Sequence, residues 1–461
     1  GDTMYSGGPN GMRPSVGLSA NLKKHGLEIL RFKTGTPSRV DRRSLHLDKM
    51  ELEEGDPEDH AFSFMSERKD RNKRNCWLTY TNEKTHDIIR ENIMRAPKYA
   101  GKIHGIGARY CPSIEDKVVR FADKDRHQLF VEPEGLDTTE MYVQGMSTSM
   151  PIDVQYAFLR TIPGFEDVKM MRPAYAIEYD LLDPLQLYPT LEVIKLPGLY
   201  SAGQSNGTSG YEEAAAQGLV AGINAALKIQ GKDPFILARH EAYIGSLVDD
   251  LVTKGADEPY RMMTSRSEYR LILRQDNADL RLTEKGHSIG LVGEERYARF
   301  LERKKKYEEA MDYIRTQRFT PKEEINRALE SMGTAPLTTG TGADQILKRP
   351  EMTYRKMMET LGCPSFDEEA VEEMEITVKY EGYIARQEAA VRKAARMENE
   401  KLPLDMDYLS LDGISTEARQ KMDKIRPLSL GQAARIPGVS PADISVLMVY
   451  VKQRKGKKSA E

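Results

Sequence analysis

The sequence predicts an α/β part over residues 1–231, followed by an all-α part over residues 232–461. In the first part, short runs rich in β-branched and aromatic residues alternate with turn clusters, as strands do. Three such runs are residues 27–32, 76–81 and 127–133. After Asp233 apolar residues recur at helical spacing instead, most plainly over residues 371–398. Shorter helices are expected in the first part, at residues 81–96 and 113–122.

Composition and charge limit the classes of protein to consider. The chain has 461 residues, 39% of them hydrophobic and 30% charged, with a net charge of -3. This length predicts roughly three domains with substantial buried cores. No apolar run approaches the ~20 residues of a membrane span, and the residues after Gly1 lack the apolar core of a signal peptide. We therefore expect a soluble, cytoplasmic protein with no membrane span.

The cysteines indicate neither a disulfide framework nor a metal site. The sequence contains three, Cys76, Cys111 and Cys363, which cannot all pair, and no CxxC occurs. This usage favours a reducing compartment. We expect Cys76 and Cys363 to be structural, and we expect no bound metal.

Residues 198–227 predict a strand, a glycine loop and a helix in succession. The run "LYSA" suits the strand, Gly203, Gly207 and Gly210 suit the loop, and the alanine-rich run that follows suits the helix. Glycines let a backbone approach a ligand closely, and free N–H groups at a helix start attract phosphate or a polarised carbonyl. The spacing is not GxGxxG, so a tight turn without a ligand stays an open interpretation.

Residues 107–117, "GARYCPSIEDK", place a thiol beside a cation at the start of a predicted helix. Either Pro112 takes the first helical position or Ser113 caps the helix. In both cases Cys111 lies at the positive end of the helix and beside Arg109, which favours the thiolate. Groups nearby that could transfer protons are Glu115, Asp116 and Lys117. An inert thiol under a loop is the alternative.

Residues 258–282 carry arginines with tyrosines between them. The arginines fall near helical spacing and are Arg261, Arg266, Arg270, Arg274 and Arg281. Arginine interleaved with Tyr260 and Tyr269 suits phosphate contacts and base stacking. The alternative is an exposed helix whose arginines pair with acids, which would be Glu268, Asp276 and Asp279.

The run "IPGVSPADI" near the C-terminus could form a glycine hairpin that opens a helix. Its N–H groups and the basic residues after it could contact a nucleic-acid backbone. A turn and helix without a ligand is the commoner arrangement.

Taken together, these stretches closely resemble the MnmG family, also called GidA, flavoproteins of tRNA wobble-uridine modification. The matching strings run in order along nearly the whole chain and are "KTGTPSRVD", "NEKTHD", "RYCPSIEDK", "RPAYAIEYD", "AGQSNGTSGYEEAAAQGL", "MMTSRSEYRLILRQDNADLRLTE", "KRPEMTY" and "VKYEGYIARQ". The resemblance implies an incomplete FAD/NAD-binding, Rossmann-like part with insertions, followed by the all-α C-terminal domain. It further implies a division into five parts. Residues 1–36 are a remnant of the nicotinamide-side insertion domain, residues 37–112 are part of the FAD-binding domain, and residues 113–186 are an insertion domain. Residues 187–231 are the remainder of the FAD-binding domain, and residues 232–461 are a helical tRNA- and partner-binding domain.

The resemblance also implies cofactors, partners and site residues. The family adds a carboxymethylaminomethyl or aminomethyl group to C5 of the wobble uridine. It uses FAD, NADH and a one-carbon unit from methylenetetrahydrofolate. Its members form homodimers and act together with the GTPase MnmE. Residues implied at the FAD site are Ser15, Gly203, Gln204, Gly207 and Glu212. Those implied at the NAD site are Gly107, Ala108, Arg109, Tyr110, Cys111, Pro112, Ser113, Ile114, Glu115, Asp116, Lys117, Val118, Val119, Arg120 and Phe121. Cys111 and Lys117 are implied in catalysis, and tRNA binding is implied for Arg261, Arg270 and Arg274.

One departure from the family pattern concerns the FAD diphosphate. Family members begin with a strand and a GxGxxG turn that holds this group, and no GxGxxG occurs in these 461 residues. We therefore expect an N-terminally truncated member that binds FAD weakly and is inactive alone. The alternatives are a non-catalytic fragment that binds tRNA and MnmE, and a relative of the folate-dependent tRNA uridine methyltransferases.

Overall fold

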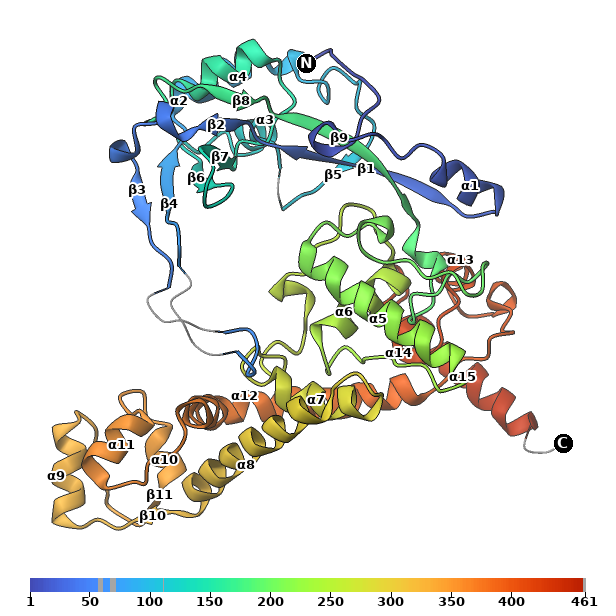
Figure 1. Cartoon of the computed structure of the whole chain (residues 1–461). Helices are drawn as coiled ribbons and strands as arrows, with labels where there is room; N and C mark the ends of the chain where they lie inside the picture. The colour runs from blue at the N-terminus through green and yellow to red at the C-terminus, as the bar shows by residue number, and fades with distance from the viewer. Residues whose placement is uncertain (57–60, 67–71, 111, 459–461) are drawn as a thin grey trace. The chain divides into compact units, whose positions relative to one another are not determined.

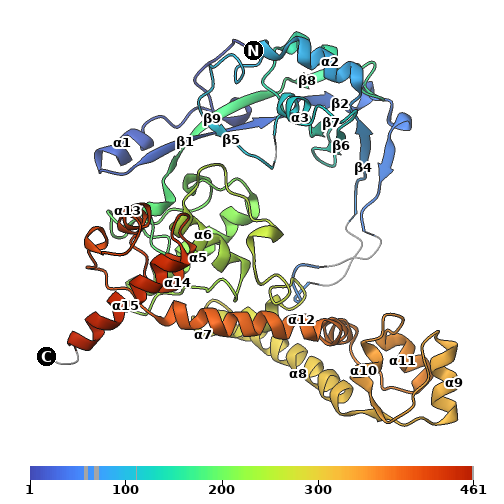
Figure 2. The same ribbon diagram turned by 180° about the vertical axis from the view of Figure 1, so that it is seen from behind.

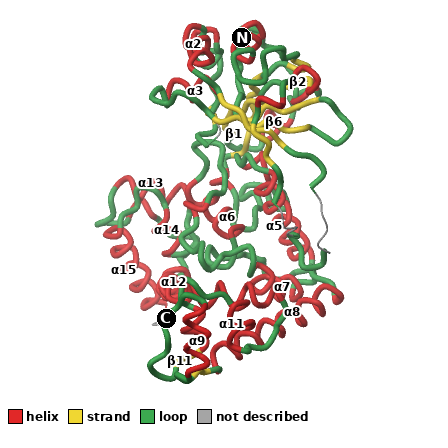
Figure 3. Tube along the Cα trace, turned by 90° about the vertical axis from the view of Figure 1, so that its left-hand side faces the viewer, coloured by secondary structure: helices red, strands yellow, loops and turns green. Residues whose placement is uncertain are grey.

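The computed structural model describes residues 1–56, 61–66, 72–110 and 112–458, without the side chains of residues 455–458. Its contacts divide into two compact units. Unit 1 comprises Gly1–Phe62, Ser66–Phe235 and Gly255–Arg261, and unit 2 comprises Ser63–Met65, Ile236–Lys254 and Met262–Glu461. Most strands belong to unit 1, whereas unit 2 is built mainly from helices (Figures 1 and 3). The predicted order of an α/β part and then a helical part is confirmed.

A three-stranded sheet in unit 1 supports the residues of the candidate site. Its central strand, β1 (Ile29–Thr36), pairs antiparallel with β9 (Tyr175–Leu182) and parallel with β5 (Ile106–Gly107). Side chains alternate across a strand, so Phe32 points to one face, where it packs with Leu181 and Ala256. The neighbouring Lys33 points to the other face.

A six-stranded sheet carries the main core of unit 1. The strand order is β3-β4-β6-β7-β2-β8. The strands are β2 (Arg39–Asp41), β3 (Glu51–Glu53), β4 (Cys76–Tyr80), β6 (Gln128–Pro133), β7 (Glu140–Gln144) and β8 (Met170–Arg172). Apolar residues of this sheet pack against those of α2 (Glu83–Glu91), α3 (Ile114–Arg120) and α4 (Ile152–Leu159). The predicted strands at 76–81 and 127–133 are thereby confirmed as β4 and β6.

The predicted succession of strand, glycine loop and helix is partly confirmed. The helix is α5 (Tyr211–Ile229), and the loop before it contains the short 3-10 turn Gly203–Asn206. The predicted strand "LYSA" is wrong: Tyr200 forms only an isolated bridge with Glu192. Its neighbours make hydrogen bonds within a compact local loop, such as Ser201 N–H to the Leu191 carbonyl, so no extended ladder forms.

Unit 2 contains two helical cores joined by one long helix. The first core takes residues from α8 (Glu294–Thr316), α9 (Glu323–Ser331), α10 (Ala343–Leu347) and α11 (Tyr354–Leu361). The second takes residues from α13 (Thr416–Ile425), α14 (Leu430–Arg435) and α15 (Pro441–Lys458). Helix α12 (Glu368–Asn399) contributes to both, as Figure 2 shows. The predicted helix at 371–398 is confirmed.

Candidate functional site

The glycine loop is fixed from inside by one glutamine of α5. The Gln217 side-chain oxygen accepts hydrogen bonds from the Gly203 N–H at 3.1 Å and from the Asn206 amide at 2.9 Å. Its nitrogen donates to the Thr208 hydroxyl at 2.9 Å. Gln217 and Asn206 are fully buried. Because buried amides need partners, this network gives the loop one defined conformation.

Gly207 occupies a position that other residues would strain. Its φ is +83°, in the left-handed region that favours glycine. A Cβ there would lie 2.8 Å from Leu181 Cδ1 and 3.1 Å from Ala256 Cβ. The loop therefore lies directly against β9 and the segment around Ala256.

The segment Gly255–Arg261 runs alongside the same loop and forms an isolated bridge with it between Tyr260 and Thr208. The Tyr260 N–H donates to the Gly207 carbonyl at 2.8 Å, and the Ser209 N–H donates to the Tyr260 carbonyl at 3.1 Å. Tyr260 is buried. These contacts fix the start of the arginine-rich stretch beside the glycine loop.

The helical spacing inferred for residues 258–282 is wrong over most of its length. The structure has a 3-10 turn at Thr264–Arg266 and begins a helix, α7 (Ala278–Ser288), only at Ala278. Backbone N–H groups in between bond to a distant side chain, since Leu271 and Ile272 both donate to Gln387 at 3.2 Å. Such long-range partners override a local periodicity.

Three segments that were singled out separately in the sequence meet in unit 1. Arg109 Nε lies 2.8 Å from a carboxylate oxygen of Glu258, and the Tyr110 and Ser209 hydroxyls form a hydrogen bond. Arg261 lies 3.8 Å from the carboxylate of Glu212. The stretch at 107–110, the glycine loop and the start of the arginine-rich stretch therefore form one site.

Of the two possible starts for the helix after Cys111, the structure has the capped one. The Ser113 hydroxyl accepts a hydrogen bond from the Asp116 N–H at 3.4 Å, and α3 begins at Ile114. Cys111 itself lies outside the described residues. Arg109 is 80% exposed at its side chain, so its cation is accessible to solvent.

Buried charges lie beneath this helix start. Asp116 accepts two hydrogen bonds from the Lys98 ammonium, at 2.6 and 2.7 Å, and one from the Tyr99 hydroxyl at 3.0 Å. Burial alone would raise the pKa of Asp116, but these partners and the charge of Lys33 hold it below its ordinary value. Glu115 is fully buried, and neither carboxylate oxygen accepts a hydrogen bond from the described residues.

Lys33 is a residue of this site that the sequence analysis missed. It is only 6% exposed, which is rare for lysine. It pairs in register with Gly107 across the parallel strands, so its stem lies beside the 107–110 stretch. The available signal was a lysine inside an otherwise strand-like run, in the string "KTGTPSRVD".

Other predicted residues are spread more widely. Lys117 donates to the Gly145 carbonyl at 3.1 Å. Ser15 is exposed in the segment before α1 (Leu18–Lys24), and no hydrogen bond in the described part of unit 1 joins it to the glycine loop. In unit 2, Arg270 is exposed and makes no ion pair with described residues. Arg274 is held by Asp276 at 2.9 Å and by Glu373 at 2.5 Å.

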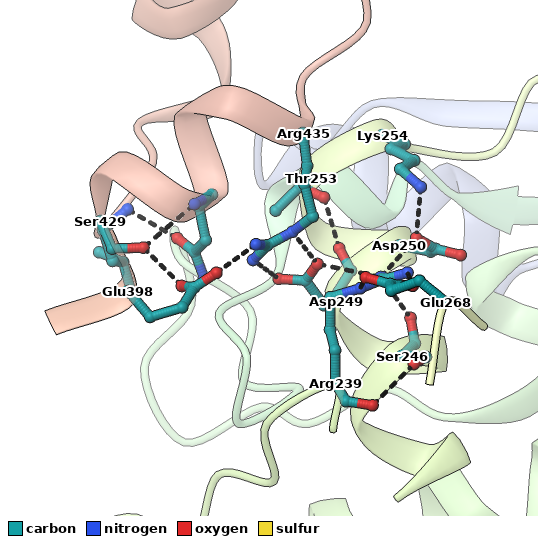
Figure 4. A network of polar contacts seen from close by, with 12 residues as sticks. Arg239, Ser246, Asp249, Asp250, Thr253, Lys254, Glu268, Glu398, Ser429 and Arg435 are labelled. Carbon is teal, nitrogen blue, oxygen red and sulfur yellow. Dashed lines mark hydrogen bonds and ion pairs between the residues drawn. The ribbon is translucent and has the colours of Figure 1, made fainter. Parts of the chain in front are cut away.

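A network of ion pairs in unit 2 is shown in Figure 4. Several of its residues line an open pocket of about 410 Å³. Arg239 is 8% exposed and contacts Asp250 at 2.7 Å and Glu268 at 2.8 Å. Burial alone would lower the Arg239 pKa, but the hydrogen bonds that Arg239 donates to Glu268 and the nearby acidic charges raise it. The guanidinium stays charged, so these contacts tie α6 (Tyr243–Lys254) to the residues around Glu268.

No cluster of three or more potential metal ligands occurs among the residues that the structure describes. Over the same residues, no helix combines the length and apolar character that a membrane crossing requires.

Comparison with known proteins decides the family. Residues 1–233 match the family model described as Glucose inhibited division protein A. Residues 294–388 match the tRNA modifying enzyme MnmG/GidA C-terminal helical domain, and residues 390–461 match its C-terminal helical bundle. The chain belongs to the MnmG/GidA family. It is therefore an enzyme by family, and the resemblance inferred from the sequence is confirmed.

Curated MnmG relatives are similar over almost the whole chain. The tRNA uridine 5-carboxymethylaminomethyl modification enzyme MnmG of Caldicellulosiruptor saccharolyticus is 56% identical over 456 residues, which cover 99% of this chain and 73% of the relative. The Enterococcus faecalis enzyme of the same name is 55% identical over 459 residues, with the same coverage of 99% and 73%. The chain thus spans about three quarters of their length.

Solved GidA structures share the fold. Aquifex aeolicus GidA in its form II crystal has a TM-score of 0.86 and 45% identity, covering 98% of this chain and 72% of that one. The form I crystal gives 0.86 and 46%, covering 98% and 73%.

Proposed function

We propose that this chain modifies C5 of the wobble uridine in tRNA, by carboxymethylaminomethyl or aminomethyl addition, together with the GTPase MnmE. FAD, NADH and a one-carbon unit from methylenetetrahydrofolate take part, and the enzyme works in the cytoplasm as a homodimer. The observation that carries this proposal is the meeting of residues 107–110, the glycine loop and Arg261 in one site. The names of the curated relatives support it.

The glycine loop and the start of α5 fit one part of a flavin. Gly203 has a φ of +73°, and a Cβ there would lie 3.1 Å from Ala214, so the loop backbone closes tightly onto the helix. No side chain caps the N-terminus of α5, which leaves its positive end to polarise a carbonyl. We assign Gly203, Gln204 and Gly207 to this contact. The bound flavin would supply hydride or one-carbon transfer.

The diphosphate of FAD needs a further contact. The GxGxxG turn that binds this group in related folds does not occur in the sequence. We propose that flavin binding by this chain depends on a segment that supplies such a turn. The residue assignments for NAD at 107–121 and the five-part domain division stay predictions of the same proposal.

Cys111 is proposed to act on the uridine ring. C5 of uridine is a poor nucleophile until a group adds at C6 or a proton is withdrawn, and a thiolate performs either task. Arg109 two residues earlier in the sequence and the start of α3 three residues later are the features that favour the thiolate. Lys117 is kept as a second proposed catalytic group. Arg261 and Arg270 are proposed to contact tRNA phosphates.

The absorption spectrum of the purified protein tests the flavin assignment. We would compare the chain alone with the chain fused behind the N-terminal segment of the Caldicellulosiruptor saccharolyticus relative, each with added FAD and then NADH. The fusion should show a bound-flavin spectrum that NADH bleaches, and the chain alone should bind flavin weakly. A folded fusion that takes up no flavin would contradict the proposal.

A further inference from the structure

The middle of α12 is exposed over most of its surface, with Ile384, Gln387 and Val391 half-buried on one side. Met374 and Val378 pack into the first helical core of unit 2, and Met397 packs against the second. Between them, no residue from Tyr380 to Arg396 is buried. A helix segment that packs against so little is expected to be strongly polar and to bridge two folded parts. This segment instead contains two tyrosines and several alanines.

One side of the segment is held by Gln387. Its oxygen accepts from the Leu271 and Ile272 N–H groups at 3.2 Å, and its amide donates to the Glu268 carbonyl at 3.3 Å. Helical geometry turns by about 100° per residue, so Ala389 and Lys393 point away from this contact. The face that they mark is left to solvent.

That face has a distinctive composition. Its residues are all exposed, are spaced by three or four along the helix, and include no acid; they are Gly382, Tyr383, Arg386, Ala389, Ala390, Lys393 and Arg396. We call them the basic face of α12. The Arg386 guanidinium lies 5.9 Å from the centre of the Tyr383 ring. Lys393 and Arg396 make no ion pair within the described part of unit 2, and neither does Arg386.

Internal packing does not account for the small residues of this face. Glycine in a helix interior costs about 1 kcal/mol relative to alanine. No heavy atom lies within 4 Å of the position that a Gly382 Cβ would take. Small residues between cations do let the backbone of a ligand approach the helix closely. Arg386 and Lys393 are two helical turns apart, ~10 Å along the axis, so they can meet separate charges of an extended polyanion.

We propose that the basic face of α12 binds the sugar–phosphate backbone of the tRNA substrate, with Tyr383 available for base stacking. Unpaired arginine and lysine side chains on a face without acids are complementary to phosphates, and tyrosine beside arginine suits unstacked bases. This inference rests on the proposed function, since it takes tRNA as the substrate. An acidic surface of a protein partner is the competing occupant, and the experiment below distinguishes it.

The test measures binding of the whole chain to unmodified tRNA transcript by fluorescence anisotropy at several salt concentrations. The variant R386A/K393A should bind about tenfold more weakly, and the slope of log Kd against log salt should fall by about 1.5. A389E adds an acid to the face without removing any contact, and it should weaken binding similarly. The matched control K305A/R355A removes two cations that are 76% and 85% exposed on α8 and α11, and it should bind like the unaltered chain. Circular dichroism would check that every variant is folded.

Each outcome decides the proposal. Equal binding by the face variants and the control would overturn it while leaving the proposed function intact. Loss of MnmE binding with unchanged tRNA binding would assign the face to a protein partner and also overturn it. Absence of tRNA binding by the unaltered chain at every salt concentration would contradict the proposed function as well.

Discussion

Arg435 forms a two-pronged ion pair with Asp249: its Nε and Nη2 lie 2.6 and 2.8 Å from the two carboxylate oxygens. The same guanidinium also contacts Glu398 at the end of α12. Asp249 belongs to α6 and Arg435 to α14, so the pair ties the C-terminal bundle to an element almost two hundred residues earlier in the chain (Figure 4).

Asp249→Asn should therefore destabilise unit 2 strongly. The substitution removes one carboxylate partner from each of two largely buried guanidinium groups, Arg239 and Arg435. Removing one partner of a buried ion pair typically lowers the free energy of unfolding by roughly 3 kcal/mol. Chemical denaturation of the two proteins measures the difference. Glu323→Gln breaks an ion pair with Arg327 that is exposed on both sides, so it should cost well under ~1 kcal/mol. Equal effects of the two substitutions would show that the Arg435 pair is not structurally important.

Stability should fall with rising pH because of Glu373. Burial and the hydrogen bond with Asp276 raise the pKa of Glu373 to about 8. The folded chain then keeps a proton that the unfolded chain releases above about pH 4.3. Unfolding releases that proton, so the free energy of unfolding decreases as pH rises from about 5 through about 8. The lowered pKa of Asp276 acts only at more acidic pH.

Denaturation midpoints between pH 5 and 8.5 test this dependence. Glu373→Gln should flatten the decrease, because the amide mimics the protonated carboxyl at every pH. The neighbouring Glu372 is exposed, so Glu372→Gln should leave the dependence as it is. A slope unchanged by Glu373→Gln would show that another group titrates.

Two glycines of the site region should respond in opposite ways to alanine. Gly207→Ala forces a side chain into the left-handed region and against Leu181, which should destabilise unit 1 by about 3 kcal/mol. Gly218 lies on α5 with no heavy atom within 4 Å of its Cβ position, so Gly218→Ala should stabilise by about 0.5–1 kcal/mol. Thermal unfolding of both variants measures the contrast. Two shifts of the same sign would contradict the loop geometry described for Gly207.

Local patterns were sufficient to predict several of the regular elements. The strands β1, β4 and β6 and the helix α12 overlap the runs where strand-like composition or helical spacing indicated them. The Ser113 cap was one of two starts that residue preference allowed, and its hydrogen bond to Asp116 decided between them.

The site itself was predictable only in pieces. Residues 107–110, the glycine loop and Arg261 were each singled out, but their meeting depends on contacts such as Tyr260 with Gly207, more than fifty residues apart. The same kind of distant partner, Gln387, explains why residues near Leu271 are not helical. Lys33 was missed because a single lysine in a strand-like run gives no sign that the folded chain will bury it.

Nucleoside mass spectrometry of cellular tRNA tests the central claim most directly. The host would lack its own MnmG-family gene and would express this chain fused behind the N-terminal segment of the Caldicellulosiruptor saccharolyticus relative, in parallel with a Cys111→Ser form. We predict that the fusion restores the C5-modified wobble uridine and that the Cys111→Ser form, equally abundant and folded, does not. A folded fusion that binds flavin yet leaves the uridine unmodified would contradict the assignment of this chain as a tRNA uridine-modifying enzyme. Full modification by the Cys111→Ser form would show that the thiol takes no part.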